Sequence, residues 1–91
     1  MKKRLHVYYS GMVQGVGFRF TAERIAINLG LKGWARNLFD GRVEIVCEGE
    51  ESNLADFINK MKNGSMRHYI TDAKVIWQEA TGEFADFAIR F

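Results

Sequence analysis

The chain contains no proline, and its only cysteine is Cys47. One cysteine cannot form an internal disulfide and has no neighbouring cysteine with which to bind zinc, so we interpret Cys47 as a small apolar core residue. Nowhere is there a run of about 20 apolar residues, the length that a membrane helix needs, and the basic N-terminus lacks the apolar stretch of a signal peptide. These absences predict a cytoplasmic protein with no membrane partner.

Histidine is also scarce, and the excess of positive charge is small. His6 falls in a predicted strand and His68 in a predicted loop, and neither has a carboxylate or a second histidine near it at ligand spacing. We therefore predict no metal site and no cofactor. The net charge of +2 favours small anions but falls short of the dense basic stripe of a protein that binds duplex nucleic acid, so no nucleic-acid partner is expected.

The length and composition are those of a small folded unit. A chain of 91 residues buries only about 60 to 65% of the surface that its unfolded form exposes, which allows one thin core. A hydrophobic fraction of 47% and a charged fraction of 26% exclude a disordered or fibrous chain. No linker, internal repeat, low-complexity segment or unusually apolar surface stripe is evident. Residues 1–91 are therefore predicted to form a single domain and a monomer.

The first third of the chain predicts a strand, a glycine-rich loop and a helix. From Leu5 to Val13 apolar and polar residues alternate, which is typical of a strand. Glycines then break the pattern and predict a tight loop around Gln14 to Phe18. A helix is predicted from Thr21, a plausible N-cap, to Leu29, with Gly30 at its C-terminal cap. Its apolar stripe, at i, i+3, i+4 and i+7, consists of Ala22, Ile25, Ala26 and Leu29.

The rest of the chain predicts a hairpin, a second helix and two further strands. The pair Asp40-Gly41 is a strong hairpin signal between two extended segments. The second helix has apolar residues at helical spacing and is closed by Gly64. A polar loop is predicted from Asn63 to Thr71. The predicted elements are strands at Gly33–Leu38 and Arg42–Glu48, a helix from Ser52 to about Lys62, a strand through Ala73 to Gln78, and a short last strand through Phe87, Ile89 and Phe91.

This order, βαββαβ with a short extra C-terminal strand, defines the predicted fold class. It is an α+β ferredoxin-like sandwich, in which two helices lie on one face of a mainly antiparallel sheet. The fold by itself identifies no activity, because many functions share it.

The stretch from Gly11 to Arg19 carries the strongest chemical signal. Three glycines lie between a strand and a helix, where curled backbone N–H groups and the positive end of the helix dipole attract an anion such as phosphate. Arg19 follows at the mouth of the helix, and its planar fork can take two phosphate oxygens at once. Alternatively, the glycines only permit a sharp turn and Arg19 is a solvated charge. No Gly-Lys-Ser/Thr follows, which excludes a Walker loop.

Two motifs in this order resemble those of the acylphosphatase family. The first signature matches at Gly11, Val13, Gln14, Gly15, Val16, Phe18 and Arg19, and the second at Gly33, Trp34, Ala35, Arg36, Asn37, Gly41, Val43 and Gly49. The likeness extends over nearly the whole chain.

The resemblance implies hydrolysis of an acyl phosphate to a carboxylate and inorganic phosphate, without a metal or other cofactor. By the same resemblance, Arg19 is the phosphate-binding arginine and Asn37 is the catalytic residue that orients water. The phosphate-binding loop would comprise Gln14, Gly15, Val16, Gly17, Phe18 and Arg19. The partner expected is a small-molecule acyl phosphate. An asparagine near a hairpin can instead satisfy the backbone of the turn, which is the structural alternative for Asn37.

The chain departs from the family pattern in its loops, and two other functions remain open. Phe39 stands where many relatives have proline, and the loop from Ser65 to Tyr69 lacks prolines, which bears on loop rigidity. A ferredoxin-like sheet with exposed aromatic residues can stack RNA bases, although we expect Trp34 and Trp77 to pack in the core. A module like the acylphosphatase-type domains of larger proteins is the third possibility, but no linker or second domain accompanies the motif here.

Overall fold

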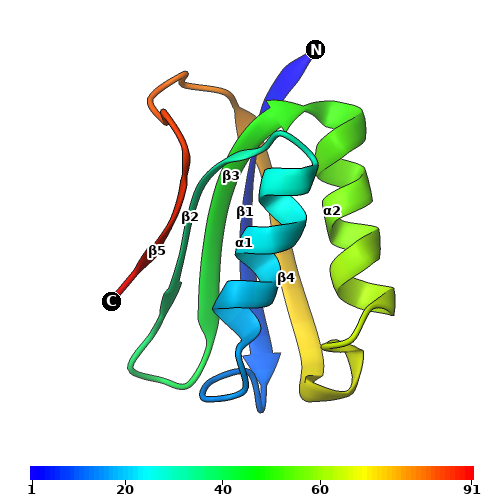
Figure 1. The fold of residues 1–91 in the computed structure, drawn as a ribbon, viewed down its shortest axis with the longest axis vertical. Coiled ribbons are helices and arrows are strands. Elements are labelled where there is room, and N and C mark those ends of the chain that lie inside the picture. The colour runs from blue at the N-terminus through cyan, green and yellow to red at the C-terminus, as the bar shows by residue number, and fades with distance from the viewer.

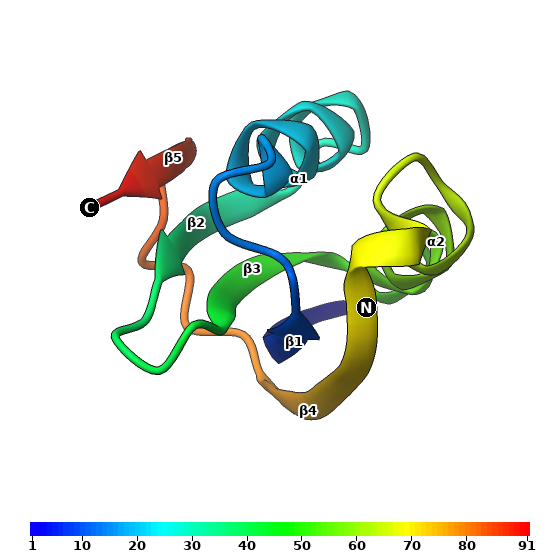
Figure 2. The ribbon, with the colours of Figure 1, turned by 90° about the horizontal axis from the view of Figure 1, so that it is seen from below.

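The computed structural model describes all residues, 1–91, and arranges them in two layers (Figure 1). Two helices lie on one face of a five-stranded sheet, and the opposite face of the sheet carries no helix (Figure 2). The predicted ferredoxin-like α+β class is confirmed. The elements are β1 Lys2–Gly11, α1 Phe18–Asn28, β2 Lys32–Asn37, β3 Val43–Glu50, α2 Glu51–Asn63, a 3-10 turn Arg67–Tyr69, β4 Ile70–Glu79 and β5 Phe87–Arg90.

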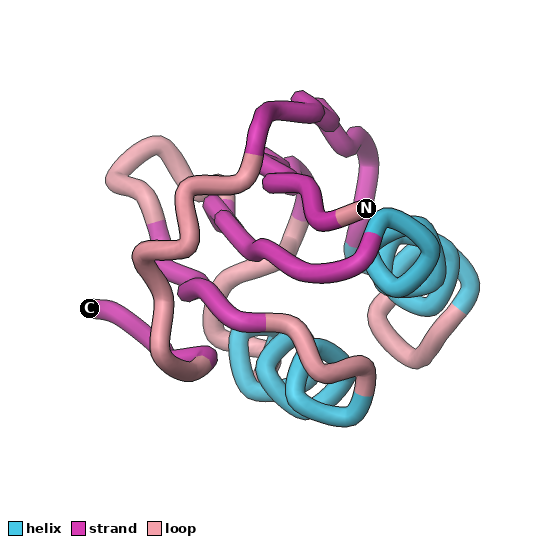
Figure 3. Tube along the Cα trace, turned by 90° about the horizontal axis from the view of Figure 1, so that it is seen from above, coloured by secondary structure: helices cyan, strands magenta, loops and turns pink.

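The strand order in the sheet is β4-β1-β3-β2-β5. The pairs β1–β3, β1–β4 and β2–β3 are antiparallel, while β5 runs parallel to β2. The predicted hairpin is present, because β2 and β3 pair across the turn that contains Asp40 and Gly41. Since β4 and β5 lie at opposite edges, the loop that joins them passes from one side of the sheet to the other (Figure 3). Neither helix is long and apolar enough to cross a membrane.

The core lies between the helices and the sheet. Leu5 and Val7 of β1 are fully buried and stand opposite Cys47 and Ile45 of β3 in the antiparallel register. Cys47 is therefore the small core residue that the sequence predicts, and its burial raises the pKa of the thiol to about 12. The helices add the apolar stripes expected from their spacing, with Ala22, Ala26, Leu54, Phe57 and Met61 buried and Ile25, Leu29 and Ile58 packed against them.

The start of α1 differs from the prediction. The helix begins at Phe18 rather than at Thr21, and its N-cap is Gly17, in the left-handed region with φ of 78°. Thr21 is buried inside the first turns, and its N–H donates to the Gly17 carbonyl (3.1 Å). Thr21 was therefore wrongly predicted as the N-cap. Phe18 and Arg19 carry no capping signal in the sequence, so the helix was predicted to begin after them, but both lie inside it. This places the guanidinium-bearing residue in the first helical turn.

Both helices end at the predicted glycines. After α1, the N–H of Leu31 donates to Ala26 (2.9 Å) and the N–H of Gly30 donates to Ile27 (3.0 Å), which is the Schellman pattern of a helix end. Gly64 occupies the C-cap of α2. Glycine positions thus predicted the helix ends better than they predicted the helix start.

The bounds of β1 and β4 differ most from the prediction. β1 begins before the predicted Leu5–Val13 segment and ends at Gly11, because the next N–H, that of Met12, donates to the carbonyl of Tyr69 (2.9 Å). β4 begins at Ile70, inside the predicted polar loop, where it extends the pairing with β1. Both differences come from contacts between segments far apart in the sequence.

Contrary to the prediction, neither tryptophan packs in the core. Trp77 is 45% exposed because β4 is an edge strand. Trp34 is half-buried, and the guanidinium groups of Arg36 and Arg90 lie 5.1 and 4.7 Å from its ring centroid. Cation–π contacts of this kind are favourable at partly exposed sites. The stacking partners of Trp34 are therefore the protein's own arginines.

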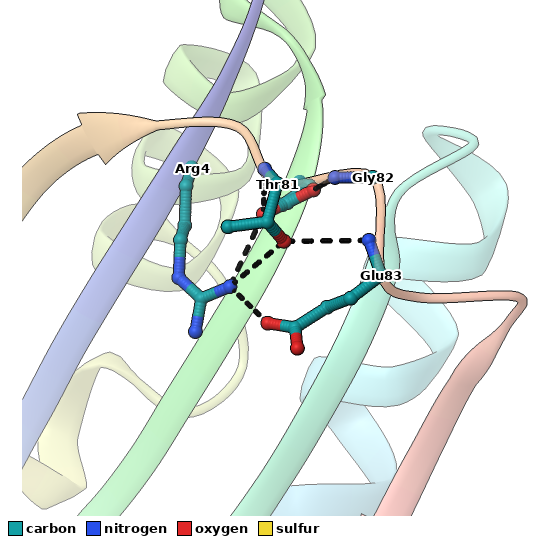
Figure 4. A network of polar contacts seen from close by, with 5 residues as sticks. Arg4, Thr81, Gly82 and Glu83 are labelled. Atoms are coloured by element: carbon teal, nitrogen blue, oxygen red, sulfur yellow. Dashed lines mark hydrogen bonds and ion pairs between the residues drawn. The ribbon is translucent and has the colours of Figure 1, made fainter.

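A carboxylate network holds the loop between β4 and β5 on the sheet (Figure 4). The two oxygens of the buried Glu48 side chain accept hydrogen bonds from the N–H groups of Thr81 (2.8 Å) and Gly82 (2.9 Å), from the Thr81 hydroxyl (2.9 Å) and from the Arg4 guanidinium (3.2 Å). Arg4 also pairs with Glu83. Burial would raise the pKa of Glu48, but the donated hydrogen bonds outweigh it and hold the pKa below its ordinary value.

The lowered pKa predicts an acid-sensitive contribution to stability. The contribution is present above the unfolded pKa of about 4.5 and is lost as the pH falls through the lower folded pKa. We expect Glu48→Gln to weaken the dependence of the unfolding free energy on pH between about pH 5 and 3, measured by urea denaturation at each pH. Glu79→Gln, which removes an exposed ion pair with Lys3, should leave that dependence unchanged. Parallel pH profiles for the wild type and Glu48→Gln would contradict the assignment.

Candidate active site

The loop between β1 and α1 presents a run of unpaired backbone donors. None of the N–H groups of residues 14–17 donates to a backbone carbonyl, and residues 18–20 form the first helical turn, whose N–H groups have no acceptor within the helix. Gly15 and Gly17 adopt φ of 76° and 78°, which other residues rarely tolerate, and no acidic residue lies in the first turn. Donors at a helix N-terminus without a nearby carboxylate suit an anion.

Apolar side chains fix this loop to the core. Phe18 is 2% exposed, and its ring meets that of Tyr9 edge-on at 5.2 Å between centroids. Val13 is buried, and Val16 packs against the same cluster. The side chains of Val16 and Phe18 therefore point into the protein. These two loop residues can contact a ligand only through their backbone groups.

Arg19 is held by the C-terminal strand. Its Nη1 donates to the carbonyl of Arg90 (2.9 Å), and its guanidinium carbon lies 4.9 Å from the centroid of the Phe91 ring. No carboxylate pairs with Arg19 in the structure. A guanidinium has five N–H donors, so one hydrogen bond to a carbonyl orients the group and leaves donors for an anion.

Asn37 is the last residue of β2 and pairs with Val43 of β3. Its Oδ1 is buried and accepts no hydrogen bond. The turn beyond it is closed by other groups: Leu38 donates to the Arg42 carbonyl (2.8 Å), and the Arg42 N–H donates to Asp40 (3.1 Å). The structure therefore does not support the alternative in which the oxygen of Asn37 satisfies the turn. An unmatched buried acceptor is unfavourable and calls for a functional explanation.

The fold brings the predicted residues to one end of the sheet, the lower end in Figure 1. The side chain of Gln14 contacts the carbonyls of Leu38 and Arg42 in the β2–β3 turn. Arg19 contacts Arg90, which is opposite Arg36 in the β2–β5 register and thus adjacent to Asn37 on β2. The loop, the start of α1 and the end of β2 therefore meet.

Two parts of this site were missed by the sequence analysis. The contact of Arg19 with Arg90 joins residues 71 positions apart, and no local pattern signals it. Gln14 was predicted only as a member of the phosphate-binding loop, and the contact of its side-chain amide with the neighbouring hairpin was not foreseen. The only sequence signal for this contact is the residue type, because the amide nitrogen of glutamine carries two donors and can bind two carbonyls.

One expectation about His6 was wrong. A carboxylate does lie beside it, since its Nε2 is 2.7 Å from Oε2 of Glu44. Glu44 stands opposite Tyr8, two residues along β1 from His6, so the pair became visible only with the strand register. Glu44 also accepts from Arg36 (2.7 Å). Burial opposes the charged form, but these hydrogen bonds hold the pKa of Glu44 below its ordinary value. No group of three or more histidine, cysteine, aspartate or glutamate side chains suitable for a metal ion is present.

An α+β sandwich with free loop amides at a helix N-terminus and an unpaired arginine beside them defines an anion-handling protein of the phosphate-binding class. Comparison with known proteins gives the particular family. The family model named Acylphosphatase matches residues 5–89, and the chain belongs to the acylphosphatase family. It is accordingly a hydrolase that acts on the acid anhydride of acyl phosphates, with a small-molecule phosphate substrate.

Individual relatives agree with the family assignment. The chain is 39% identical to the acylphosphatase of Caldanaerobacter subterraneus subsp. tengcongensis, over 98% of this chain and 99% of that protein. The crystal structure of the acylphosphatase of Bacillus subtilis superposes with a TM-score of 0.91 at 37% identity, over the full length of both chains. Full-length HypF, in its phosphate- and nucleotide-bound form, matches with a TM-score of 0.87 at 30% identity, over all of this chain but 12% of HypF.

Proposed function

We propose that the loop amides of residues 14–19 and the guanidinium of Arg19 bind the phosphoryl group of an acyl phosphate, while Asn37 orients the attacking water. The observation that carries this proposal is the meeting of three features at one end of the sheet. These are unpaired backbone donors, an arginine without a carboxylate partner, and a carboxamide whose oxygen has no protein donor.

The reaction needs few groups because its leaving group is a carboxylate. The water oxygen attacks phosphorus as the bond between phosphorus and the acyl oxygen breaks, and the electron pair of that bond remains on the carboxylate. Such a weak base needs no proton, so a general acid is not required. The proton of the attacking water passes to a non-bridging oxygen of the phosphoryl group, and the products are a carboxylate and inorganic phosphate.

Electrostatic stabilisation is assigned to Arg19 and the loop amides. Phosphoryl transfer spreads negative charge over the equatorial oxygens, and preorganised donors near these oxygens lower the barrier. Arg19 is oriented by the Arg90 carbonyl before substrate arrives, so less freedom is lost when it binds. The positive end of α1 acts on the same charge.

Positioning of water is assigned to Asn37. A carboxamide can accept a hydrogen bond from water and does not itself compete as a nucleophile. Correct placement of a reacting water can account for several kcal/mol of a barrier, on the order of 7 or more in the best cases. Asn37 stands at the end of β2, adjacent to the strand position that faces Arg90.

Hydrolysis of benzoyl phosphate with a metal chelator present tests the chemistry. We expect full activity in excess chelator, because Arg19 and the loop amides neutralise charge that another enzyme would give to a metal ion. Release of benzoate is measured with and without the chelator, and inorganic phosphate serves as a competitive inhibitor. Loss of activity that added Mg²⁺ restores would refute the proposed division of roles.

A further inference from the structure

The side chain of Gln14 uses both of its N–H donors on the neighbouring hairpin. Its Nε2 is 2.7 Å from the Leu38 carbonyl and 3.0 Å from the Arg42 carbonyl. The carboxamide is partly buried. Both hydrogens of the amide are engaged within the protein, so the side chain of Gln14 is not available as a phosphate donor.

The two acceptors lie on either side of the β2–β3 turn. The N–H of Leu38 donates to the Arg42 carbonyl, and the N–H of Gly41 donates to the Leu38 carbonyl. One amide group of Gln14 therefore binds both ends of this turn. Leu38 directly follows Asn37, and Gln14 directly precedes the glycine at which the curled loop begins.

This is the one hydrogen-bonded connection between the loop and the turn. The backbone of Met12 bonds elsewhere, to Tyr69, and no backbone hydrogen bond joins residues 13–17 to residues 37–42. The side chains of Asp40 and Arg42 brace the turn internally, through hydrogen bonds within residues 40–42. Gln14 is therefore the direct hydrogen-bonded tie between the loop and the turn that follows Asn37.

We propose that Gln14 is a positioning residue, which sets the distance between the phosphoryl group in the loop and the water held by Asn37. This inference rests on the proposed function of Asn37 and Arg19. A displacement of about 1 Å between reacting groups can lower a rate by about 100-fold, so a tie between the two half-sites affects turnover. Phosphate affinity depends on the loop amides and Arg19, which this tie leaves in place.

The test uses Gln14→Leu, which keeps a similar volume and removes both donors, and Gln14→Glu, which places acceptor oxygens against two carbonyls. We expect kcat for benzoyl phosphate to fall by about 10- to 100-fold in both variants. The inhibition constant of inorganic phosphate should stay within about two-fold in Gln14→Leu, whereas the added carboxylate of Gln14→Glu should also weaken phosphate binding. Gln78→Leu, on the exposed surface of β4, is the matched control and should retain wild-type kinetics. If Gln14→Leu does not fold, Gln14→Asn replaces it. This variant keeps the amide but shortens its reach, and the same comparison of kcat with the inhibition constant of inorganic phosphate applies.

A double mutant separates positioning from a general structural effect. In the Asn37→Ala background, Gln14→Leu should lower kcat by less than about three-fold, because its effect acts through Asn37. An equal loss of kcat in both backgrounds, or a loss confined to phosphate affinity, would overturn the inference. Unchanged kcat in Gln14→Leu, with a large loss in Asn37→Ala, would reject the inference and leave the proposed function intact. Unchanged kcat in Asn37→Ala would reject the proposed function itself.

Discussion

Replacing Arg19 by alanine is expected to lower kcat/KM for benzoyl phosphate by about 1,000-fold or more, because the charge that builds on the phosphoryl oxygens loses the guanidinium proposed to stabilise it. Arg19 has no carboxylate partner, so its charge is available to the substrate. Binding of inorganic phosphate should weaken as well, since a charge-assisted hydrogen bond contributes about 1.5 to 3 kcal/mol. Steady-state kinetics with phosphate as the inhibitor measure both effects.

Two further variants show whether charge or geometry matters. Arg19→Lys keeps the charge but loses the planar fork, so it should recover part of the phosphate affinity and little of kcat. Arg24→Ala removes another cation from an exposed position on α1 and should behave as the wild type. Wild-type turnover in Arg19→Ala would refute the assignment of the site. An equal loss of kcat/KM in Arg24→Ala would show that the effect of Arg19→Ala comes only from the change in net charge.

The elements of this fold were predictable where local periodicity governs them. The stripes of α1 and α2 repeat at helical spacing, and the Asp-Gly pair marks the β2–β3 hairpin, so their existence followed from short-range rules. The ends of α1 show the limit of those rules. Gly30 marks the C-terminus through its backbone hydrogen bonds, whereas Phe18 starts the helix because its ring packs into the core, which is a tertiary contact.

The sequence suggested which residues belong to the candidate site, but it could not show the contacts that orient them. Arg19, Asn37 and the loop were found through motif resemblance and loop chemistry. The contacts that orient them join residues that only the folded sheet brings together: Arg19 with Arg90, and Gln14 with Leu38 and Arg42. The same reason explains the His6–Glu44 pair, because the register of two strands determines which side chains are neighbours.

The buried oxygen of Asn37 connects the function of the site to its stability. No group of the protein donates to this oxygen, so no hydrogen bond within the fold explains an asparagine at this position. Removal of the side chain should therefore affect activity without a loss of stability.

Asn37→Ala is accordingly expected to lower kcat for benzoyl phosphate by about 100-fold or more, with the inhibition constant of inorganic phosphate within about two-fold of the wild type. The unfolding free energy should be unchanged or higher, because truncation removes the unmatched Oδ1 at the end of β2. Kinetics and urea denaturation on the same preparation measure the two effects. Asn59→Ala, on the exposed face of α2, is the matched control.

The combination of effects is what identifies the role of Asn37. A fall in kcat together with a collapse of phosphate affinity would make Asn37 a binding group and reject the role in orienting water. A large loss of stability would show that its amide has a structural partner, and the lost activity would then follow from unfolding. Reduced turnover in a variant that binds phosphate normally and is at least as stable as the wild type would support the proposed role, because neither weaker phosphate binding nor unfolding would then account for the loss.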